Sequence, residues 1–345
     1  MQDGSKTATR LIPDRQRGLA CCRLHDMSLI ELRDVRKIYP SKKGEVKALD
    51  GLNLTVEEGT VRGLLGPNGA GKTTTVKVLT TLSKPTSGQA TVAGIDVTQR
   101  PDDVRRIIGA SGQYATIDEE LTARENLVLV GRLFHLGEKQ AKARADELLE
   151  IFTLQKAANR PIKGFSGGMR RRADLAASLV NDPQILFLDE PTTGLDPAAR
   201  LALWDVIRDR VSRGTTLLLT TQYLEEADAL ANEISVVDHG RVIAEGTADE
   251  LKTRVGGQRV QITAVEAEDV DTVRRLIAEV AQNEQAISVQ DRTVAAQVHD
   301  GTSALQHVLG GLRDNNIAVH DAGLARPSLD DVFLQLTGGK AGDGQ

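Results

Sequence analysis

One stretch of the chain carries the residue types that bind a polyphosphate, at the spacing Gly-x-x-x-x-Gly-Lys-Thr. It consists of Gly66, Pro67, Asn68, Gly69, Ala70, Gly71, Lys72, Thr73 and Thr74. The glycines let the backbone bend around phosphate groups and turn its N–H groups toward them. Lys72 can reach the β- and γ-phosphates, and the Thr73 hydroxyl can ligate Mg²⁺. The stretch therefore predicts a site for a nucleoside triphosphate and its magnesium ion.

A phosphate-binding loop needs a strand before it and a helix after it. Residues 61–65 are apolar and read as a buried strand. Residues 75–82 carry apolar side chains at helical spacing, namely Val76, Leu79 and Leu82. The N-terminus of such a helix would add its partial positive charge to the loop.

Two carboxylates follow a second apolar run. Residues 185–188 read as a buried strand that ends in Asp189 and Glu190. In a doubly wound sheet, the carboxyl ends of the strands lie beside the phosphate loop. We expect Asp189 to hold the Mg²⁺ shell and Glu190 to orient and polarise the attacking water.

A second potential anion site is formed by Ser166, Gly167 and Gly168, just before a helix predicted to run to Val180. Two anion-binding helix starts in one chain predict a triphosphate held from both sides. Since one copy cannot easily fold its second site onto its first, we expect a twofold dimer. In it, the Ser166 loop of each copy covers the nucleotide held by the other.

The bulk properties limit the remaining possibilities. The 345 residues are enough for a large domain and a smaller one, and no apolar run approaches a membrane span. The net charge of −5 gives no reason to expect nucleic acid as a partner. Cys21 and Cys22 are adjacent, which excludes a disulfide scaffold and fits a reducing cytosol. Because Met27 opens the first periodic segment, we expect residues 1–27 to be a disordered extension; intact mass of native protein would test whether it is present.

The order of predicted elements indicates an α/β fold with a largely parallel central sheet. The chain begins with predicted strands, and Tyr39-Pro40 is expected to end the first of them. Two amphipathic helices follow residue 122, opened by the capping box Thr122-Ala-Arg-Glu125. The pattern changes near residues 246–257, and the order β-α-β-β-α-β beyond them predicts a small α+β, ferredoxin-like module.

Taken in order, these motifs resemble the nucleotide-binding domain of an ABC transporter. The motifs are Tyr39, the phosphate loop, Gln113, Phe-Ser-Gly-Gly-Met at 165–169, Leu-Asp-Glu-Pro at 188–191, Gly-Leu-Asp at 194–196, and the position after Thr220-Thr221. The resemblance covers residues 28–250 and implies a P-loop NTPase fold with a β-rich ATP-binding core and a helical subdomain at about 114–182. It also implies a head-to-tail dimer that closes on ATP, opens on hydrolysis and moves separate membrane subunits.

The resemblance assigns further roles residue by residue. Tyr39 would stack on adenine, and Gln113 would bridge Mg²⁺, the attacking water and the membrane-facing loop. Ser166 and Gly168 would bind the γ-phosphate held by the other copy. Asp196 would carry contact between the two sites across the dimer.

One departure from the family pattern bears on catalysis. Gln222 stands where most of the superfamily carries a histidine; the signature also has Phe165 and Met169 in place of Leu and Gln. An amide can donate a hydrogen bond to the γ-phosphate but bears neither charge nor proton. We therefore expect Gln222 to act in catalysis together with Glu190 and Gln113. The pH profile of hydrolysis should then lack a group that titrates at about 6–7.

The chain's ending narrows the resemblance. Residues 326–338 resemble the C-terminal element of the daunorubicin-resistance ATP-binding subfamily. That subfamily works with separate ABC-2 type membrane proteins to export drugs, antibiotics or lipids, which implies a location at the cytoplasmic face of the cell membrane. Leu329, Val332, Phe333 and Leu336 share one helical face, which would pack on the chain's own domain or on the partner subunit.

The residues leave two alternative functions open. A soluble, non-transport ABC ATPase is disfavoured by the single nucleotide domain, and an importer ATPase would more often carry a C-terminal barrel.

Residues 127–136 are predicted either to receive a helix of the membrane subunit or to be buried within the helical subdomain. In domain terms we expect residues 28–250 to bind ATP, residues 257–338 to form an accessory domain, and residues 339–345 to be a flexible tail.

Overall fold

A computed structural model of the protein describes residues 28–41, 44–112, 117–254, 258–283, 287–325, 328–329, 332–333 and 336. The predicted site residue Gln113, the expected extension 1–27 and the expected tail 339–345 lie outside the described residues.

The first layer is an antiparallel four-stranded sheet with the order β2-β1-β4-β5. Its strands are β1 (Ser28–Ser41), β2 (Gly44–Glu57), β4 (Ser87–Val92) and β5 (Ile95–Asp96). The prediction that Tyr39-Pro40 ends the first strand is wrong, because β1 continues through Pro40, which pairs with Glu45 near the hairpin turn. A proline without an N–H is tolerated at such an end.

The second layer is a six-stranded sheet with the order β10-β9-β3-β8-β7-β6, parallel except for β10. Its strands are β3 (Val61–Leu65), β6 (Ile108–Ser111), β7 (Ile185–Asp189), β8 (Thr216–Thr221), β9 (Glu233–Asp238) and β10 (Arg241–Gly246). Alternate residues of β7 face opposite cores: Phe187 packs toward the first sheet, whereas Leu186 and Leu188 pack toward the helices. This burial on both faces explains why the parallel strands are continuously apolar.

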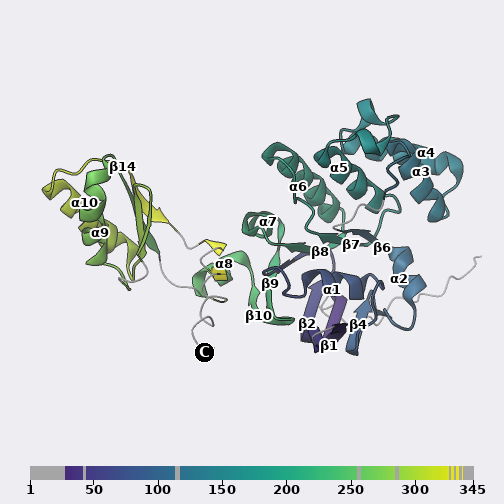
Figure 1. Cartoon of the computed structure of the whole chain (residues 1–345), viewed down its shortest axis with the longest axis horizontal. Helices are drawn as coiled ribbons and strands as arrows, with labels where there is room; N and C mark the ends of the chain where they lie inside the picture. Colours follow the sequence, from purple (N-terminus) through teal and green to yellow (C-terminus); the bar gives the residue numbers. More distant parts are fainter. Residues whose placement is uncertain are drawn as a thin grey trace, which may run out of the picture.

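Helices lie on both sides of this sheet (Figure 1). They are α1 (Lys72–Leu79), α2 (Pro101–Ile107), α3 (Ala123–Leu133), α4 (Glu138–Ile151), α5 (Gly167–Ser178), α6 (Pro197–Ser212), α7 (Leu224–Leu230) and α8 (Ala248–Arg254). The predicted capping box is present, since Thr122 and Glu125 bond to each other's backbone N–H groups at the start of α3. The helix after the phosphate loop ends at Leu79 instead of Leu82, and Leu82 is 75% exposed.

The third sheet has the order β12-β13-β11-β14 and is antiparallel. Its elements are β11 (Arg259–Ala264), α9 (Val270–Ala278), β12 (Ser288–Gln290), β13 (Thr293–Gln297), α10 (Gly301–Asp314) and β14 (Val319–Ala325). Both helices pack on one face of the sheet around a core of its own that includes Ile262 and Val308. The predicted ferredoxin-like order is therefore confirmed. The α/β fold class is confirmed by the second sheet, which is parallel except for β10 and has helices on both sides.

The chain then returns to the part that carries the phosphate loop. Leu329 and Val332 are buried against Leu65, Ile234 and Leu251, so the end of the chain packs beside the strand that precedes the phosphate loop. Of the two predicted packing surfaces, the chain's own sheet is the one that it covers in this structure.

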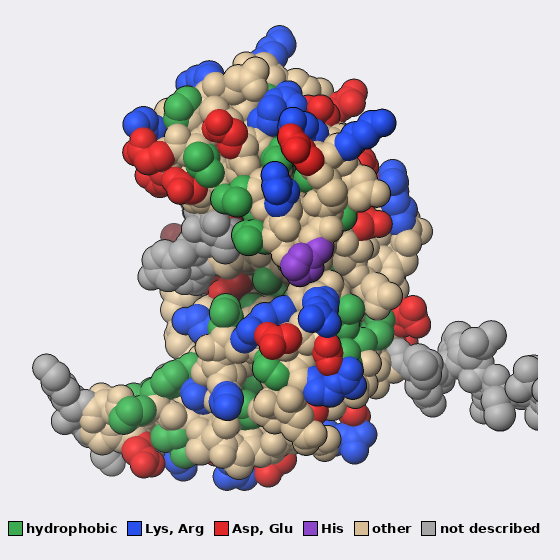
Figure 2. Space-filling model, turned by 90° about the vertical axis from the view of Figure 1, so that its right-hand side faces the viewer, with side chains coloured by type: hydrophobic (Ala, Val, Ile, Leu, Met, Phe, Trp, Pro, Cys, Tyr) green, Lys and Arg blue, Asp and Glu red, His purple; other side chains and the backbone are tan. Residues whose placement is uncertain are grey.

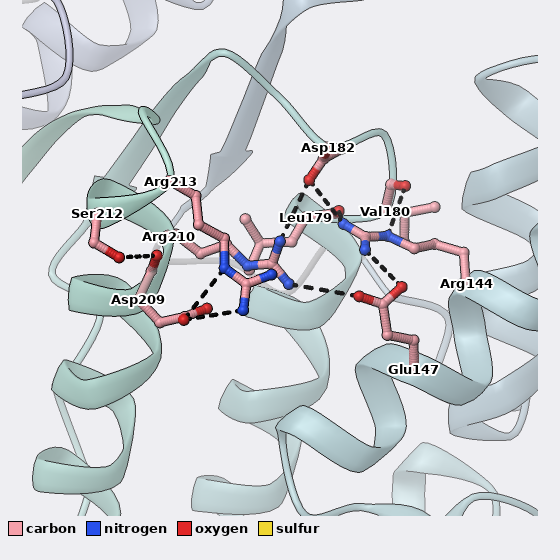
Figure 3. A network of polar contacts seen from close by, with 9 residues as sticks. All are labelled: Arg144, Glu147, Leu179, Val180, Asp182, Asp209, Arg210, Ser212 and Arg213. Carbon is pink, nitrogen blue, oxygen red and sulfur yellow. Dashed lines mark hydrogen bonds and ion pairs between the residues drawn. The ribbon is translucent and has the colours of Figure 1, made fainter.

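A network of ion pairs and hydrogen bonds links α4 and α6 to each other and to the segment before β7 (Figure 3). Arg144 of α4 donates to the carbonyls of Leu179 and Val180 and to Asp182, and Arg210 of α6 reaches the same aspartate at 3.3 Å. Asp182 therefore joins α4 and α6 at the edge of the sheet opposite to the carboxylates of β7.

Candidate functional site

The carboxyl ends of three adjacent strands bring the predicted chemistry together. The phosphate loop follows β3, Asp189 ends β7, and Thr220 and Thr221 end β8, which lies between them. Residues more than a hundred positions apart thus meet at one edge, as the sheet order predicts.

The loop's shape depends on glycine at two positions. Gly71 has φ of +110°, and a Cβ there would lie 2.6 Å from the carbonyl oxygen of Ala48. A Cβ on Gly66 would lie 2.3 Å from the carbonyl oxygen of Val237. Any side chain at either position would therefore displace backbone of a neighbouring segment, which accounts for both glycines of the motif.

Lys72 is buried and folded back over its own loop. Its Nζ donates to the carbonyl oxygens of Gly66 at 2.7 Å and Pro67 at 3.1 Å, and it lies 3.9 Å from Oε1 of Glu190. Burial lowers the pKa of Lys72, while the charges of Glu190 and Asp189 act in the opposite direction. The ammonium group is thus held inside the loop beside the predicted catalytic carboxylate.

Two hydroxyls converge on Asp189. Thr73 donates to its Oδ1 at 3.3 Å, and the Thr220 hydroxyl donates to the same oxygen. A hydroxyl oxygen and a carboxylate side by side are oxygen ligands of the kind that Mg²⁺ takes, so the donor set fits this ion. Thr220 was not singled out from the sequence, although its place at a strand end was a usable signal.

Glu190 is buried and adopts φ of +50°. Its N–H donates to the carbonyl oxygen of Thr220 at 3.0 Å, and its Oε2 accepts from the Thr193 hydroxyl at 3.4 Å. A left-handed conformation is costly for a residue with a side chain and persists only where the surroundings impose it. This backbone directs the carboxylate toward Lys72, where the sequence predicted the catalytic base.

Arg171 is a residue that sequence reasoning missed. It lies on α5, behind the Ser166 loop, and donates to the carbonyl oxygens of Gly112, Asp189, Glu190 and Pro191. Its guanidinium also lies 3.6 Å from Asp174, one turn along the helix. Burial lowers the pKa of Arg171, and Asp174 is the largest opposing influence. The arginine therefore fixes the backbone that carries both carboxylates.

Three predicted residues lie at exposed positions instead of in the cluster around Lys72. Ser166 caps α5 by accepting the N–H of Met169 at 3.3 Å, and Asp196 caps α6 by accepting the N–H of Ala199 at 2.7 Å. Gln222 follows β8 and is exposed. Gly167 and Gly168 form the first turn of α5, so their N–H groups are those of a helix N-terminus.

Tyr39 lies within β1 and is half-buried. Its hydroxyl is 3.5 Å from that of Ser83, beyond the end of α1, and Lys37 lies over its ring at 4.9 Å from the centroid. One face of the ring therefore carries a cation–π contact.

An apolar hollow lies between the helical layer and the β-rich layer. It has a volume of about 430 Å³ and is lined by Leu82, Ile108, Val130, Leu133 and Phe134, among others. Leu82 and Leu133 are exposed by 75% and 69%. Figure 2 shows this side of the molecule, on which hydrophobic side chains gather where the two layers meet. Large exposed apolar groups in one place indicate a docking surface.

Known proteins are similar to this chain in sequence and in fold. The sequence profile described as "ABC transporter" matches residues 49–193, and that described as "ATP-binding protein DrrA1-3-like, C-terminal domain" matches residues 246–337. The daunorubicin resistance ATP-binding protein DrrA2 of Streptomyces coeruleorubidus is 55% identical over 86% of this chain and 92% of its own length. The daunorubicin/doxorubicin resistance ATP-binding protein DrrA of Streptomyces peucetius is 47% identical over 91% and 94%.

The chain belongs to the drug-resistance exporter family of ABC ATP-binding proteins. It is thus an ABC ATPase that binds nucleotide, as the phosphate loop and the paired carboxylates predicted. A dimeric ATP-binding cassette solved in a post-hydrolysis state with ADP and Pi is 27% identical, with a TM-score of 0.60 over 63% of this chain and 98% of that one. Within the described residues of this ABC ATPase, every helix is too short or too polar to span a bilayer.

Proposed function

We propose that two copies of this ABC ATPase close head to tail around two Mg²⁺–ATP molecules, and that closure and reopening drive export through separate membrane subunits. The observation that carries the proposal is the division of the site. Lys72, Asp189 and Glu190 converge at one sheet edge, whereas the Ser166 loop presents the N-terminus of α5, capped by Ser166, at the surface. The similar cassette bound to ADP and Pi is itself dimeric, which supports this arrangement.

In the bound state, Lys72 and the backbone N–H groups of residues 68–74 hold the β- and γ-phosphates, and Tyr39 stacks on the base. Thr73 and Asp189, with Gln113, would hold Mg²⁺, which would supply positive charge against the phosphates. Glu190 orients the attacking water. Gln222 donates a hydrogen bond to the γ-phosphate, and Asp196 connects the two sites.

The second anion site acts across the dimer. Ser166, Gly167 and Gly168 contact the γ-phosphate held by the other copy through the hydroxyl and the helix N-terminus. Because the Ser166 hydroxyl already caps α5, the loop is preorganised for this contact before nucleotide arrives.

Membrane subunits of the ABC-2 type are proposed to dock at the apolar hollow. Leu82, from the β-rich layer, and Leu133, from the helical layer, are exposed in the hollow, and Leu129 is exposed on the same helix as Leu133. A helix of the membrane subunit inserted there would contact both layers. This arrangement would place the ATPase at the cytoplasmic face of the membrane. The relatives are named for daunorubicin and doxorubicin resistance, which supports a drug, antibiotic or lipid as cargo.

We also propose a division into an ATP-binding domain at residues 28–250, with its helical subdomain at about 114–182, and an accessory domain at residues 257–338. The separate core around Ile262 and Val308 supports it. Packing of Leu329 and Val332 beside β3 would give the accessory domain a fixed attachment to the ATP-binding domain.

The test is dimer formation by a variant that binds but does not hydrolyse. Glu190→Gln protein with excess Mg²⁺–ATP should show twice the monomer mass by light scattering, and Glu190→Gln with Lys72→Ala should not. The proposal would be abandoned if the Glu190→Gln protein stayed monomeric with ATP even together with its membrane subunit.

A further inference from the structure

Glu226 is a buried carboxyl group that the proposed mechanism does not use. It lies in the first turn of α7, four residues after Gln222, and its side chain is 0% exposed. The indole N–H of Trp204, on α6, donates to its Oε1 at 3.3 Å. Oε2 is buried and has no hydrogen bond among the described residues.

A second unsatisfied group lies on the neighbouring loop. The Thr192 hydroxyl is buried and also lacks a hydrogen bond among the described residues. Thr192 stands between Glu190 and Asp196, on the loop that joins β7 to α6. Although Thr192 Oγ1 and Glu226 Oε2 have no hydrogen bond of standard geometry, the Thr192 hydroxyl lies close enough to the Glu226 carboxyl to lower its pKa as a hydrogen-bond donor, as does the Thr221 hydroxyl at the end of β8. Buried polar groups without partners are rare and call for an explanation.

The charges around Glu226 do not compensate an ionised carboxylate. Arg200 of α6 pairs with the exposed Glu225 and lies over the ring of Tyr223, and Arg171 of α5 donates to backbone carbonyls. Both arginines interact with the Glu226 carboxyl through longer-range electrostatics, but neither forms an ion pair with Glu226 among the residues described. Burial raises the pKa of Glu226, against the lowering influence of the Thr221, Trp204 and Thr192 hydrogen-bonding groups and of Arg200.

The Thr192 hydroxyl can donate to an ionised Oε2 or accept from a protonated one, so one hydrogen bond would satisfy the pair in either state. A neutral acid also avoids a fully buried charge that has no ion pair among the described residues. We propose that Glu226 is a positioning residue that holds its proton and ties the Gln222 segment to the Thr192 loop. The two segments that carry Gln222 and Asp196 then move as one unit.

This inference rests on the proposed function, because the unit matters for hydrolysis only where Gln222 and Asp196 act at the closed dimer. The proposed hydrogen bond between Glu226 and Thr192 lies within one copy of the chain. A spectroscopic readout in the single chain can therefore fail or succeed independently of dimer formation.

Glu226→Gln keeps the shape and a neutral donor and acceptor, whereas Glu226→Ala removes both. In the full-length protein, the Gln variant should retain kcat within about twofold at neutral pH, and the Ala variant should lose about tenfold in kcat with little change in KM for ATP. Glu225→Gln, at the exposed neighbour, is the matched control and should behave as wild type. Equal loss by the Gln and Ala variants, or no loss by either, would overturn the proposal.

The proton gives a second readout. Trp204 is the single tryptophan and donates directly to Glu226, so ionisation of that carboxyl should shift its fluorescence. The Gln variant should abolish this shift, and wild type should lose stability as pH rises from 4.5 through the raised pKa of the folded protein. A shift that persists unchanged in Glu226→Gln would refute the tie, even if Glu190→Gln protein dimerises normally.

Thr192→Val removes only the hydroxyl and serves as the partner variant. If the tie exists, Thr192→Val should lower kcat much as Glu226→Ala does, and the double variant should add little to either. Fully additive losses would contradict a shared hydrogen bond.

Discussion

Replacement of Arg171 by alanine should be among the most damaging single changes outside the nucleotide contacts. The side chain donates to four backbone carbonyls, three of which belong to Asp189, Glu190 and Pro191. It is also the basic group beside Asp174, which is 1% exposed and accepts a hydrogen bond from Ser111.

The expected cost follows from these contacts. Removing one partner of a buried ion pair costs about 3–5 kcal/mol, because the remaining charge and the carbonyls lose their donor. With an m-value of about 2–3 kcal/mol per molar urea, the midpoint should fall by roughly 1–2.5 M. Arg171→Lys should recover little, since one ammonium group cannot reach four carbonyls.

Trp204 fluorescence can follow this transition, because the only tryptophan is buried on α6. Arg170→Ala is the matched control: its side chain is 36% exposed and pairs with the exposed Glu119 at 3.1 Å. An exposed pair of this kind contributes about 0–1 kcal/mol. ATP hydrolysis should fall in Arg171→Ala and be retained in Arg170→Ala. If both variants unfolded at the same urea concentration as wild type, the assigned role of Arg171 would be wrong.

Three further changes probe separate parts of the molecule. Lys72→Ala should weaken ATP binding at least about tenfold by calorimetry, because it removes the ammonium group that the loop carbonyls hold inside the loop; equal affinity would contradict its role. Gln222→His should add a limb near pH 6–7 to the pH–rate profile, and a limb already present in wild type from no other residue would count against the reading of Gln222. Removal of residues 326–345 should uncover Leu65 and Leu251 and weaken dimerisation or export; unchanged ATPase, dimerisation and export would show that the ending is dispensable.

The parts of the site that could be predicted are those set by local spacing. A phosphate loop needs glycines at fixed positions, and the steric contacts at Gly66 and Gly71 show why. Asp189 and Glu190 could be placed beside it because strand ends of a parallel sheet share an edge. The capping box at Thr122 and Glu125 was likewise a local pattern that needed no tertiary information.

The parts that could not be predicted involve partners without a sequence signature. Arg171 bonds to backbone carbonyls, and any residue would supply the same oxygen atoms. Pro40 looked like a strand end because proline lacks an N–H, but pairing with the neighbouring strand in the hairpin overrode that preference. Leu82 fitted a helical period, yet the helix ended three residues earlier and left its side chain at the apolar hollow.

The charge balance of the site implies that nucleotide must bring its own cation. Lys72 already uses two donors on loop carbonyls, so a phosphate group exchanges these bonds for new ones instead of simply adding to them. Asp189 and Glu190 stand at the same place, and both would repel a bare triphosphate. Asp189 and Thr73 would hold an Mg²⁺ ion that would offset this repulsion, and Glu190 would remain available to orient the water. We therefore expect the two carboxylates to favour Mg²⁺–ATP over free ATP before any part of the second copy arrives.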